Sequence, residues 1–370
     1  IPDYCFAAQA ARAFWAEESG ETMKQKTNAS TLSSLSDVIK KYRTPLLCLV
    51  FALLLAFPIF VQQSSYIVSI GVKILMYAML ATALNVVNGY TGQLNIGMAA
   101  FYAIGAYTAG LLATKANVDF WILLPAAGLV TALFGLLVSL PTRRLAGTYL
   151  ALVTLGLSEI VRLIIQNWNT VTNGPMGIKD IPRAVILGHT IKSATDFYYL
   201  GLFLTAITVF AIGRVVRSNI GRTWISIRED PIASKFLGVN VNARKTLAFV
   251  FCGFFAGIAG AYCSFYYQYI SPDMFKTDES FSIMTMVIIG GQGTMLGPLI
   301  GSVLVNVLNE LMRAATKYRQ VAYGLLIILM MWLRPAGIAG DASSFRAVSL
   351  FKKRQNSKFK QRGPQNDTTI

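Results

Sequence analysis

The sequence predicts an all-α, polytopic integral membrane helix bundle with about eight full spans and one broken or re-entrant helical segment. Of the 370 residues, 54% are apolar and only 14% are charged, which is more apolar surface than one soluble core needs. The apolar residues form stretches near the length of about 20 residues that crosses a bilayer. The net charge of +16 lies mostly between and after these stretches, so membrane topology explains it better than a nucleic-acid partner does.

The predicted spans follow one another along most of the chain. They cover residues 45–62, 66–88, 97–115, 120–140, 146–166, 197–216, 245–269 and 319–334, with an interrupted stretch at 281–309. The glycines from Gly290 to Gly297, followed by Pro298, break this last stretch. Irregular backbone is tolerated at membrane depth only where protein or a polar cavity surrounds it. We therefore expect residues 281–309 to fold back.

The chain is expected to have three parts. Residues 1–44 contain no stretch long enough to span and form an N-terminal cytoplasmic segment. Within it, residues 1–22 have neither an initiator Met nor the layout of a cleaved signal, and we hypothesise that they are an upstream translation artefact or a poorly ordered extension. Residues 45–340 form the transmembrane domain, and residues 341–370 form a basic cytoplasmic tail.

The distribution of Lys and Arg predicts the orientation, because positively charged loops are retained on the cytoplasmic side. These residues gather before the first span, between the fourth and fifth, and between the sixth and seventh, and all three places fall on one side. The tail carries seven basic residues against three in the loop before the last span. Both termini are therefore predicted to be cytoplasmic, which requires residues 281–309 to return the chain to the outer side.

A polar segment at residues 84–97 lies between two apolar runs. Its amides, hydroxyl and glycines suit a zwitterionic or polar neutral solute, although an ordinary polar turn at the membrane face would have the same composition. The residues that we assign to a candidate translocation path are Asn85, Asn88, Thr91, Gln93, Asn95, Glu159, Gly291 and Gly293.

Charged residues inside the spans are few. Glu159 and Arg162 are three residues apart on one helix face, so they can form a structural pair or take part in gating or the solute path. Lys73, near the outer end of the second span, is expected to extend its ammonium group to the interface.

Residues 217–245 form the longest internal cytoplasmic segment and predict a short capped helix. Asp230 is a good N-cap, Pro231 suits the first helical position, and Gly238 is placed to end the helix. Phe236 and Leu237 would then be exposed beside basic residues. Such a face fits a groove on a partner, and the alternative is a solvated surface helix.

Catalytic and metal-binding signatures are missing from the sequence. His189 is the only histidine and the four cysteines do not cluster, so neither a metal cluster nor a histidine-based triad can be assembled. The segment 238–246 resembles a phosphate loop, but Ala243 occupies the place of the second glycine. We expect no catalytic residue, no metal and no cofactor, and no ATP hydrolysis by this chain alone.

Six segments, taken in order, resemble the permease subunits of bacterial ABC importers for branched-chain amino acids, specifically the M-type subunit of the paired permeases. The resemblance extends over about residues 45–340 and is carried by residues 88–107, 144–156, 172–178, 228–233, 290–294 and 334–338. It implies a multi-pass permease subunit of the bacterial inner membrane that imports leucine, isoleucine and valine. It also implies partners: a second related permease, two cytoplasmic ATPases that bind the ATP, an extracytoplasmic solute-binding protein and the lipid bilayer, with no nucleic acid.

The resemblance further implies that residues 217–245 couple the permease to the ATPases. In importers generally this segment resembles Glu-Ala-Ala, three residues and Gly, whereas Ile232 stands in place of the Glu here. The residues assigned to coupling are Arg222, Arg228, Glu229, Asp230, Pro231, Ala233 and Gly238.

Two alternatives stay open at this point. Related permeases that carry urea, short amides or other amino acids share these motifs, so the solute is not decided. An ion-coupled secondary transporter is a more distant alternative, because it would need intramembrane carboxylates and only Glu159 is available.

Overall fold

The computed structural model describes residues 54–58, 65–116, 118–143, 145, 147–186, 189–191, 193–313, 319–334 and 337–340. The predicted N-terminal segment, most of the first span and the basic tail lie outside these residues. The chain divides into two compact units, residues 1–63 and 64–370, and in the first unit residues 54–58 are helical.

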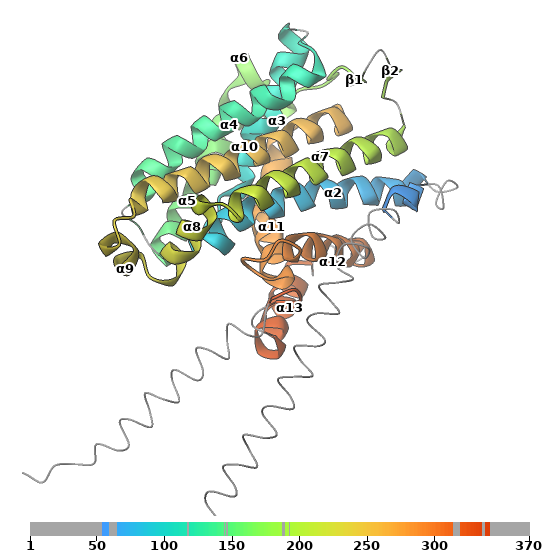
Figure 1. Cartoon of the computed structure of the whole chain (residues 1–370). Helices are drawn as coiled ribbons and strands as arrows, with labels where there is room; N and C mark the ends of the chain where they lie inside the picture. The colour runs from blue at the N-terminus through green and yellow to red at the C-terminus, as the bar shows by residue number, and fades with distance from the viewer. Residues whose placement is uncertain are drawn as a thin grey trace, which may run out of the picture. The chain divides into compact units, whose positions relative to one another are not determined.

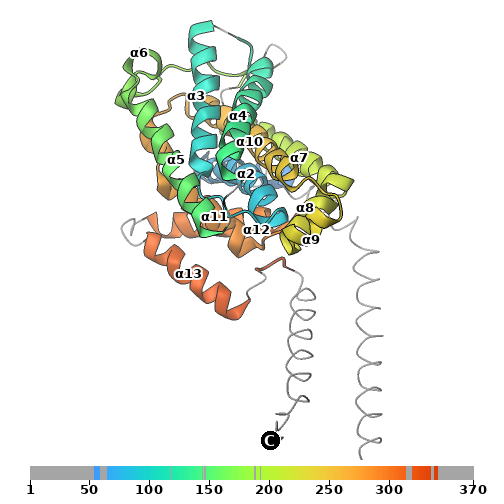
Figure 2. The ribbon, with the colours of Figure 1, turned by 90° about the vertical axis from the view of Figure 1, so that its left-hand side faces the viewer.

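The second unit is almost entirely helical (Figures 1 and 2). Short 3-10 turns are η2 (Gly174–Met176) and η3 (Pro272–Phe275). The connection between η2 and α7 (Ala194–Val216) contains two strands of two residues each, β1 (Val185–Ile186) and β2 (His189–Thr190), which pair antiparallel. The helices are α2 (Ser65–Asn85), its π-helical continuation η1 (Val86–Tyr90), α3 (Met98–Ala116), α4 (Phe120–Thr142), α5 (Thr148–Asn167), α6 (Asn169–Thr172), α7 (Ala194–Val216), α8 (Asn219–Glu229), α9 (Pro231–Phe236), α10 (Val241–Tyr267), α11 (Thr277–Gly290), α12 (Gly297–Leu311) and α13 (Arg319–Leu333).

Five helices of the described residues are long and apolar enough to cross a membrane: α2 with η1, α4, α5, α7 and α10. The polytopic membrane fold is therefore confirmed, whereas the predicted count of about eight full spans is not. Helix α3 has 19 residues but is not among the five. Its tyrosines and glycines are mostly buried against neighbouring helices, so this helix does not need the apolar surface that lipid contact requires. Helix α13 has only 15 residues.

The centre of the bundle is the packing of α10 against α3 and α4. Small residues allow this close approach: a Cβ atom at Gly105 of α3 would lie 2.5 Å from the Cα of Gly257 on α10. A Cβ at Gly253 would lie 2.6 Å from the carbonyl oxygen of Thr131 on α4. Helices in membranes gain contact in this way because lipid removes most of the hydrophobic driving force between them.

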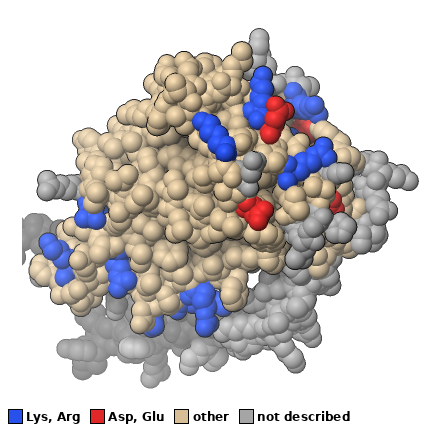
Figure 3. All heavy atoms as spheres, turned by 90° about the horizontal axis from the view of Figure 1, so that it is seen from above, with Lys and Arg blue, Asp and Glu red and all other residues tan. Residues whose placement is uncertain are grey.

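The outer surface of the helices is apolar where it would meet lipid. On α4, residues four apart are exposed: Leu129 is 64%, Leu133 60% and Leu137 56% accessible. Figure 3 shows a broad uncharged middle, with only Lys and Arg among the coloured residues at the left and lower edge and both signs of charge toward the right. An uncharged belt between charged ends is the surface expected of a protein that spans a bilayer.

The two ends of the bundle differ. One end holds α8 and α9, which follow α7 directly, and also the start of α10, where Arg143 donates from Nε to Thr246 Oγ1 over 3.0 Å. The other end holds η2 and η3, where Ile178 and Ile270 form a β-bridge. We call them the α8–α9 end and the η3 end.

The interrupted stretch folds back as predicted. Helices α11 and α12 pack against each other and are joined at residues 291–296. They contain 14 and 15 residues, so each is only about 21 to 23 Å long against a hydrocarbon thickness of about 30 Å. After α13 the chain returns to their connection, since Ile338 N donates to Ile289 O over 2.9 Å. The predicted cytoplasmic tail itself lies outside the described residues, so its side of the membrane stays a prediction.

Candidate functional site

Three segments far apart in the sequence meet at the α8–α9 end. Arg228, at the end of α8, donates from Nη1 to the carbonyl oxygen of Gly89 in η1 over 2.7 Å. Asn85, at the end of α2, accepts from Gly293 N over 2.9 Å and donates from Nδ2 to Thr294 O over 2.8 Å. We call these five residues the junction. It joins α2, α8 and the connection between α11 and α12.

Glycine is required at two positions around Arg228. Gly293 has φ +76°, and a Cβ atom there would collide with the Arg228 guanidinium. Gly92 has φ +68°, and a Cβ there would lie 3.0 Å from Cγ of Arg228. A side chain at either glycine would therefore be strained and would compete for the space that the arginine occupies.

The polar segment after α2 uses its side chains to shape its own backbone. Asn88 donates from Nδ2 to Asn95 O over 3.2 Å and accepts from Asn95 N over 3.0 Å. Thr91 donates to Val87 O over 2.6 Å, and Gln93 donates to the Thr91 hydroxyl over 3.0 Å. All of these side chains are buried. The π-helical turn that they stabilise is a rare form that occurs frequently at functional sites.

A second attachment reaches the same connection from the C-terminal side. A Cβ atom at Gly337, which has φ +79°, would collide with the backbone of Gly291. Ala339 N donates to Gly290 O over 2.9 Å. The segment that follows α13 is thus bonded to the turn between α11 and α12, next to the junction.

Helix α9 presents an apolar face that nothing in the described part of the chain covers. Ile232 is 68%, Phe236 87% and Leu237 80% exposed. Ile232 and Phe236 border a hollow of about 730 Å³, which the start of α10 completes near Asn242. An exposed apolar group of this size beside basic residues is a typical protein interaction site.

Comparison with known proteins identifies the family of this chain. The family described as branched-chain amino acid transport system, permease component, matches residues 66–333. The chain belongs to this family. It is 37% identical to the high-affinity branched-chain amino acid transport system permease protein LivM of Salmonella typhimurium, over 76% of this chain and 72% of that protein. It is 36% identical to LivM of Escherichia coli K12, with 77% and 72% covered, and 26% identical to LivH of the same organism, with 76% and 96% covered. No solved structure matches the chain.

Helix α9, in the segment that the sequence analysis assigns to coupling, forms as the sequence predicts. Asp230 is the N-cap of α9 and accepts from Ile232 N over 2.8 Å and from Ala233 N over 3.0 Å. Pro231 is the first helical residue, and Gly238, with φ +80°, follows the helix end. Short polar residues cap helices in this way because they satisfy backbone N–H groups that have no helical partner.

The remaining residues assigned to coupling differ in their surroundings. Arg222 is exposed and donates to Asn219 within its own helix over 2.5 Å, and Glu229 is exposed at the end of α8. Trp224 is fully buried and donates from Nε1 to Arg244 O over 2.9 Å. This tryptophan, which the sequence analysis did not single out, fixes α8 to the start of α10 of the permease.

The residues assigned to the translocation path do not all lie together. Asn85 and Gly293 belong to the junction, and the polar groups of residues 88–95 adjoin it. Glu159 lies elsewhere, on α5, where Arg162 donates from Nε to its carboxylate over 2.9 Å. Thr277, at the start of α11, donates to the other carboxylate oxygen over 3.3 Å. Glu159 therefore joins α5 to α11, and the path assignment stays a prediction.

Sequence reasoning did not identify Gly89, Thr294 or Gly337 as parts of a site. Their contributions are backbone carbonyls and close backbone contacts, which carry no side-chain signal. The signal that could have found them is the set of motifs quoted for the family, because four of those motifs meet around the junction.

Proposed function

We propose that this chain is the membrane-spanning permease subunit of an ATP-driven importer of leucine, isoleucine and valine, and that the junction transmits the movement of α8 and α9 to the membrane helices. The observation that carries the proposal is the hydrogen bond from Arg228 to Gly89 O. It connects the helix that bears the exposed face directly to α2 and, through Asn85, to the turn between α11 and α12.

The exposed face of α9 fits a groove on a cytoplasmic ATPase. Two such subunits would bind the ATP, since the partners and not this chain supply that chemistry. Docking would bury Phe236 and Leu237, which are 87% and 80% exposed. Burial of two large apolar side chains contributes on the order of 3 kcal/mol before the costs of association.

Rigid attachments would carry the movement inward. Trp224, in the middle of α8, ties this helix to the start of α10. Arg228, near the C-terminal end of α8, ties it to η1. A displacement of α9 would therefore act on both α10 and α2 instead of being lost in a loose loop. The solute would shift the balance between the two states only through a difference in its affinity for them.

The other partners and the orientation follow from the family and the charge distribution. This chain is similar to both LivM and LivH of one organism, which supports pairing with a second related permease. An extracytoplasmic binding protein would deliver the solute at the η3 end. The basic α8–α9 end would face the cytoplasm of a bacterial cell, with the chain as a multi-pass protein of the inner membrane.

Uptake into vesicles tests the proposal. Vesicles would hold this chain with its partner permease, ATPases and binding protein, and labelled leucine and urea would be supplied in parallel, with and without ATP. We expect leucine uptake only with ATP. Uptake of urea alone would assign another cargo to the same machine, and uptake without ATP would favour an ion-coupled transporter.

A further inference from the structure

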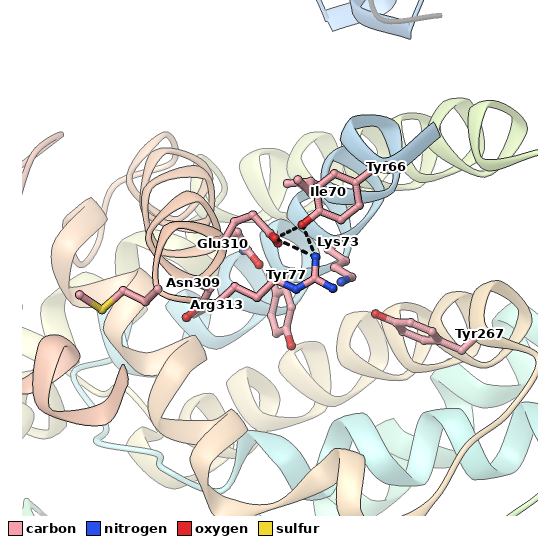
Figure 4. Close-up of a pocket in the computed structure, with 10 residues that line it drawn as sticks. Tyr66, Ile70, Lys73, Tyr77, Tyr267, Asn309, Glu310 and Arg313 are labelled. Carbon is pink, nitrogen blue, oxygen red and sulfur yellow. Dashed lines mark hydrogen bonds and ion pairs between the residues drawn. The ribbon is translucent and has the colours of Figure 1, made fainter. Parts of the chain in front are cut away.

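A second polar site lies at the η3 end, away from the junction. A cavity of about 320 Å³ opens between α2, α10 and α12 (Figure 4). The lining residues include Tyr66 and Lys73 of α2 and Tyr267, which is the last residue of α10. Glu310 of α12 and Arg313, just after that helix, line the cavity from the other side. Its volume is at the small end of the roughly 300 to 1,000 Å³ found for ligand sites, so it suits a small solute.

Lys73 is the residue that most needs an explanation. It lies in the third turn of a membrane helix and is half-buried, and its ammonium group forms no hydrogen bond or ion pair with the described residues. A charge in a membrane helix is costly and usually marks a path or a binding site. Figure 4 shows the Lys73 side chain directed into the cavity toward Arg313 instead of away from the protein.

The opposite charge in the cavity is held in place by its neighbours. Glu310 accepts a hydrogen bond from the Tyr66 hydroxyl, and Arg313 Nη1 lies 3.6 Å from the Glu310 carboxylate. Arg313 also donates to the Tyr66 oxygen over 2.6 Å. The side chain of Glu310 is 29% exposed and that of Arg313 is 71% exposed. The cavity therefore contains a positioned carboxylate next to two cations.

Neutral groups complete the wall of the cavity. Asn306 lines it with 7% of its surface exposed and donates from Nδ2 to Ser302 O over 2.8 Å. Ile70 and the rings of Tyr77 and Tyr267 provide apolar surface. The combination of both charges, the amides of Asn306 and Asn309, and an apolar wall matches a free α-amino acid with an aliphatic side chain.

We propose that this cavity binds the amino acid as a zwitterion, with Lys73 on the carboxylate, Glu310 on the ammonium group, and the apolar wall beside Ile70 on the side chain. The inference rests on the proposed function, because it gives the permease its own recognition of the imported solute at the end opposite α8 and α9. Urea has no ionised group, so Lys73 and Glu310 would contribute little to its binding.

Competition binding with the unaltered protein tests this assignment. The complete importer with both permeases and both ATPases would be placed in nanodiscs without the binding protein, and saturable binding of labelled leucine would be measured. Leucinamide lacks the carboxylate and 4-methylpentanoate lacks the ammonium group. We expect each to compete at least about tenfold more weakly than leucine, since each loses one charge-assisted contact. Equal competition by all three, or the absence of saturable leucine binding, would overturn the proposal.

Variants of the cavity add a second test. Lys73→Met and Glu310→Gln should each weaken leucine binding at least about tenfold, and Lys73→Met should also abolish the preference for leucine over leucinamide. Lys179→Met, in an exposed connection at the same end, is the matched control and should bind as the unaltered protein does. Co-purification with the ATPases and ATP hydrolysis would verify that each variant assembles. If a variant fails to assemble, the competition experiment with the unaltered protein still tests the proposal.

The two proposals fail in different ways. ATP-driven leucine uptake with cavity variants that bind like the Lys179→Met control would reject the cavity and leave the proposed function standing. Absence of ATP-driven leucine uptake by the complete unaltered system would reject the proposed function itself.

Discussion

The guanidinium of Arg228 and the carbonyl of Gly89 are 2.7 Å apart although 139 residues separate them in the sequence. Arg228 ends the helix that leads into α9, and Gly89 lies in the π-helical turn that ends α2. Helix α8, which leads into α9, is therefore attached directly to a membrane helix by a charged donor. Such bonds contribute about 1.5 to 3 kcal/mol, which is enough for a mechanical connection between two elements.

Arg228→Met should uncouple the ATPases from transport. The variant keeps a long side chain but loses the hydrogen bond to Gly89, so α9 can still dock while its movement reaches α2 poorly. We expect leucine uptake to fall by roughly tenfold with ATPase co-purification unchanged. Arg222→Met is the matched control on the same helix, because Arg222 bonds only to Asn219 in α8. Equal effects of the two substitutions would contradict the role of the junction.

Gly293→Ala should be far more harmful than Gly238→Ala. Both glycines have positive φ, +76° and +80°, so both variants suffer backbone strain of about 1 to 2 kcal/mol. Only the Cβ at position 293 would also collide with Arg228, whereas position 238 has no atom within 4 Å. Thermal unfolding of the purified variants and leucine uptake would measure the difference. A similar loss at both positions would show that strain alone matters.

Asp230→Ala should weaken docking of the ATPases by loosening α9. The carboxylate accepts from two backbone N–H groups, and loss of such a cap costs about 1 kcal/mol, which is large for a helix of six residues. Asp230→Asn should restore docking, because the amide oxygen can accept the same bonds. If Asn is as poor as Ala in co-purification, the negative charge and not the cap is what the partner requires.

ATP should still drive leucine transport in the Glu159→Gln variant. The carboxylate is bonded to Arg162 and Thr277, so it holds two helices together and is not available to carry an ion. The pair is partly exposed and contributes little more than about 1 kcal/mol. Leucine uptake with internal ATP should persist in the variant and be insensitive to collapse of the proton gradient. Loss of uptake on collapse of the gradient would revive the secondary transporter.

Impermeant thiol labelling tests the orientation. Met176, the last residue of η2, is 65% exposed and Phe236, in α9, is 87% exposed. Met176→Cys should react in intact cells, and Phe236→Cys only after the membrane is permeabilised. Cys252 and Cys263 are buried, and the other two native cysteines would be changed to serine to remove background. Labelling in the opposite order would reverse the topology.

Much of the secondary structure was predictable because its causes are local. The length of an apolar run marks a membrane helix, and Asp230, Pro231 and Gly238 mark α9 by capping, a fixed φ and freedom of backbone conformation. The predicted number of full spans is not confirmed by the described residues, among which five helices are long and apolar enough to cross a membrane. Helix α3 is mostly buried among other helices, so its composition does not follow the rules for contact with lipid, and α11 and α12 are each too short to span alone.

The candidate site was predicted only in part. The residues proposed for a solute path include Asn85 and Gly293, which the structure bonds to each other at the junction. Their amide and backbone groups suited a polar solute equally well in the sequence, because hydrogen-bonding capacity does not indicate which partner is near. Lys73 was expected to reach the interface, yet it lines a cavity with Glu310 of another helix.

By itself, the sequence determined the class of this protein, its long membrane helices and the capped form of α9. These depend on composition and on residues within one or two turns of each other. Only the tertiary structure decided that Arg228 meets Gly89 and that Lys73 and Glu310 line one cavity. Such contacts join segments separated by more than a hundred residues, and they depend on how whole helices pack, which no local pattern of residues specifies.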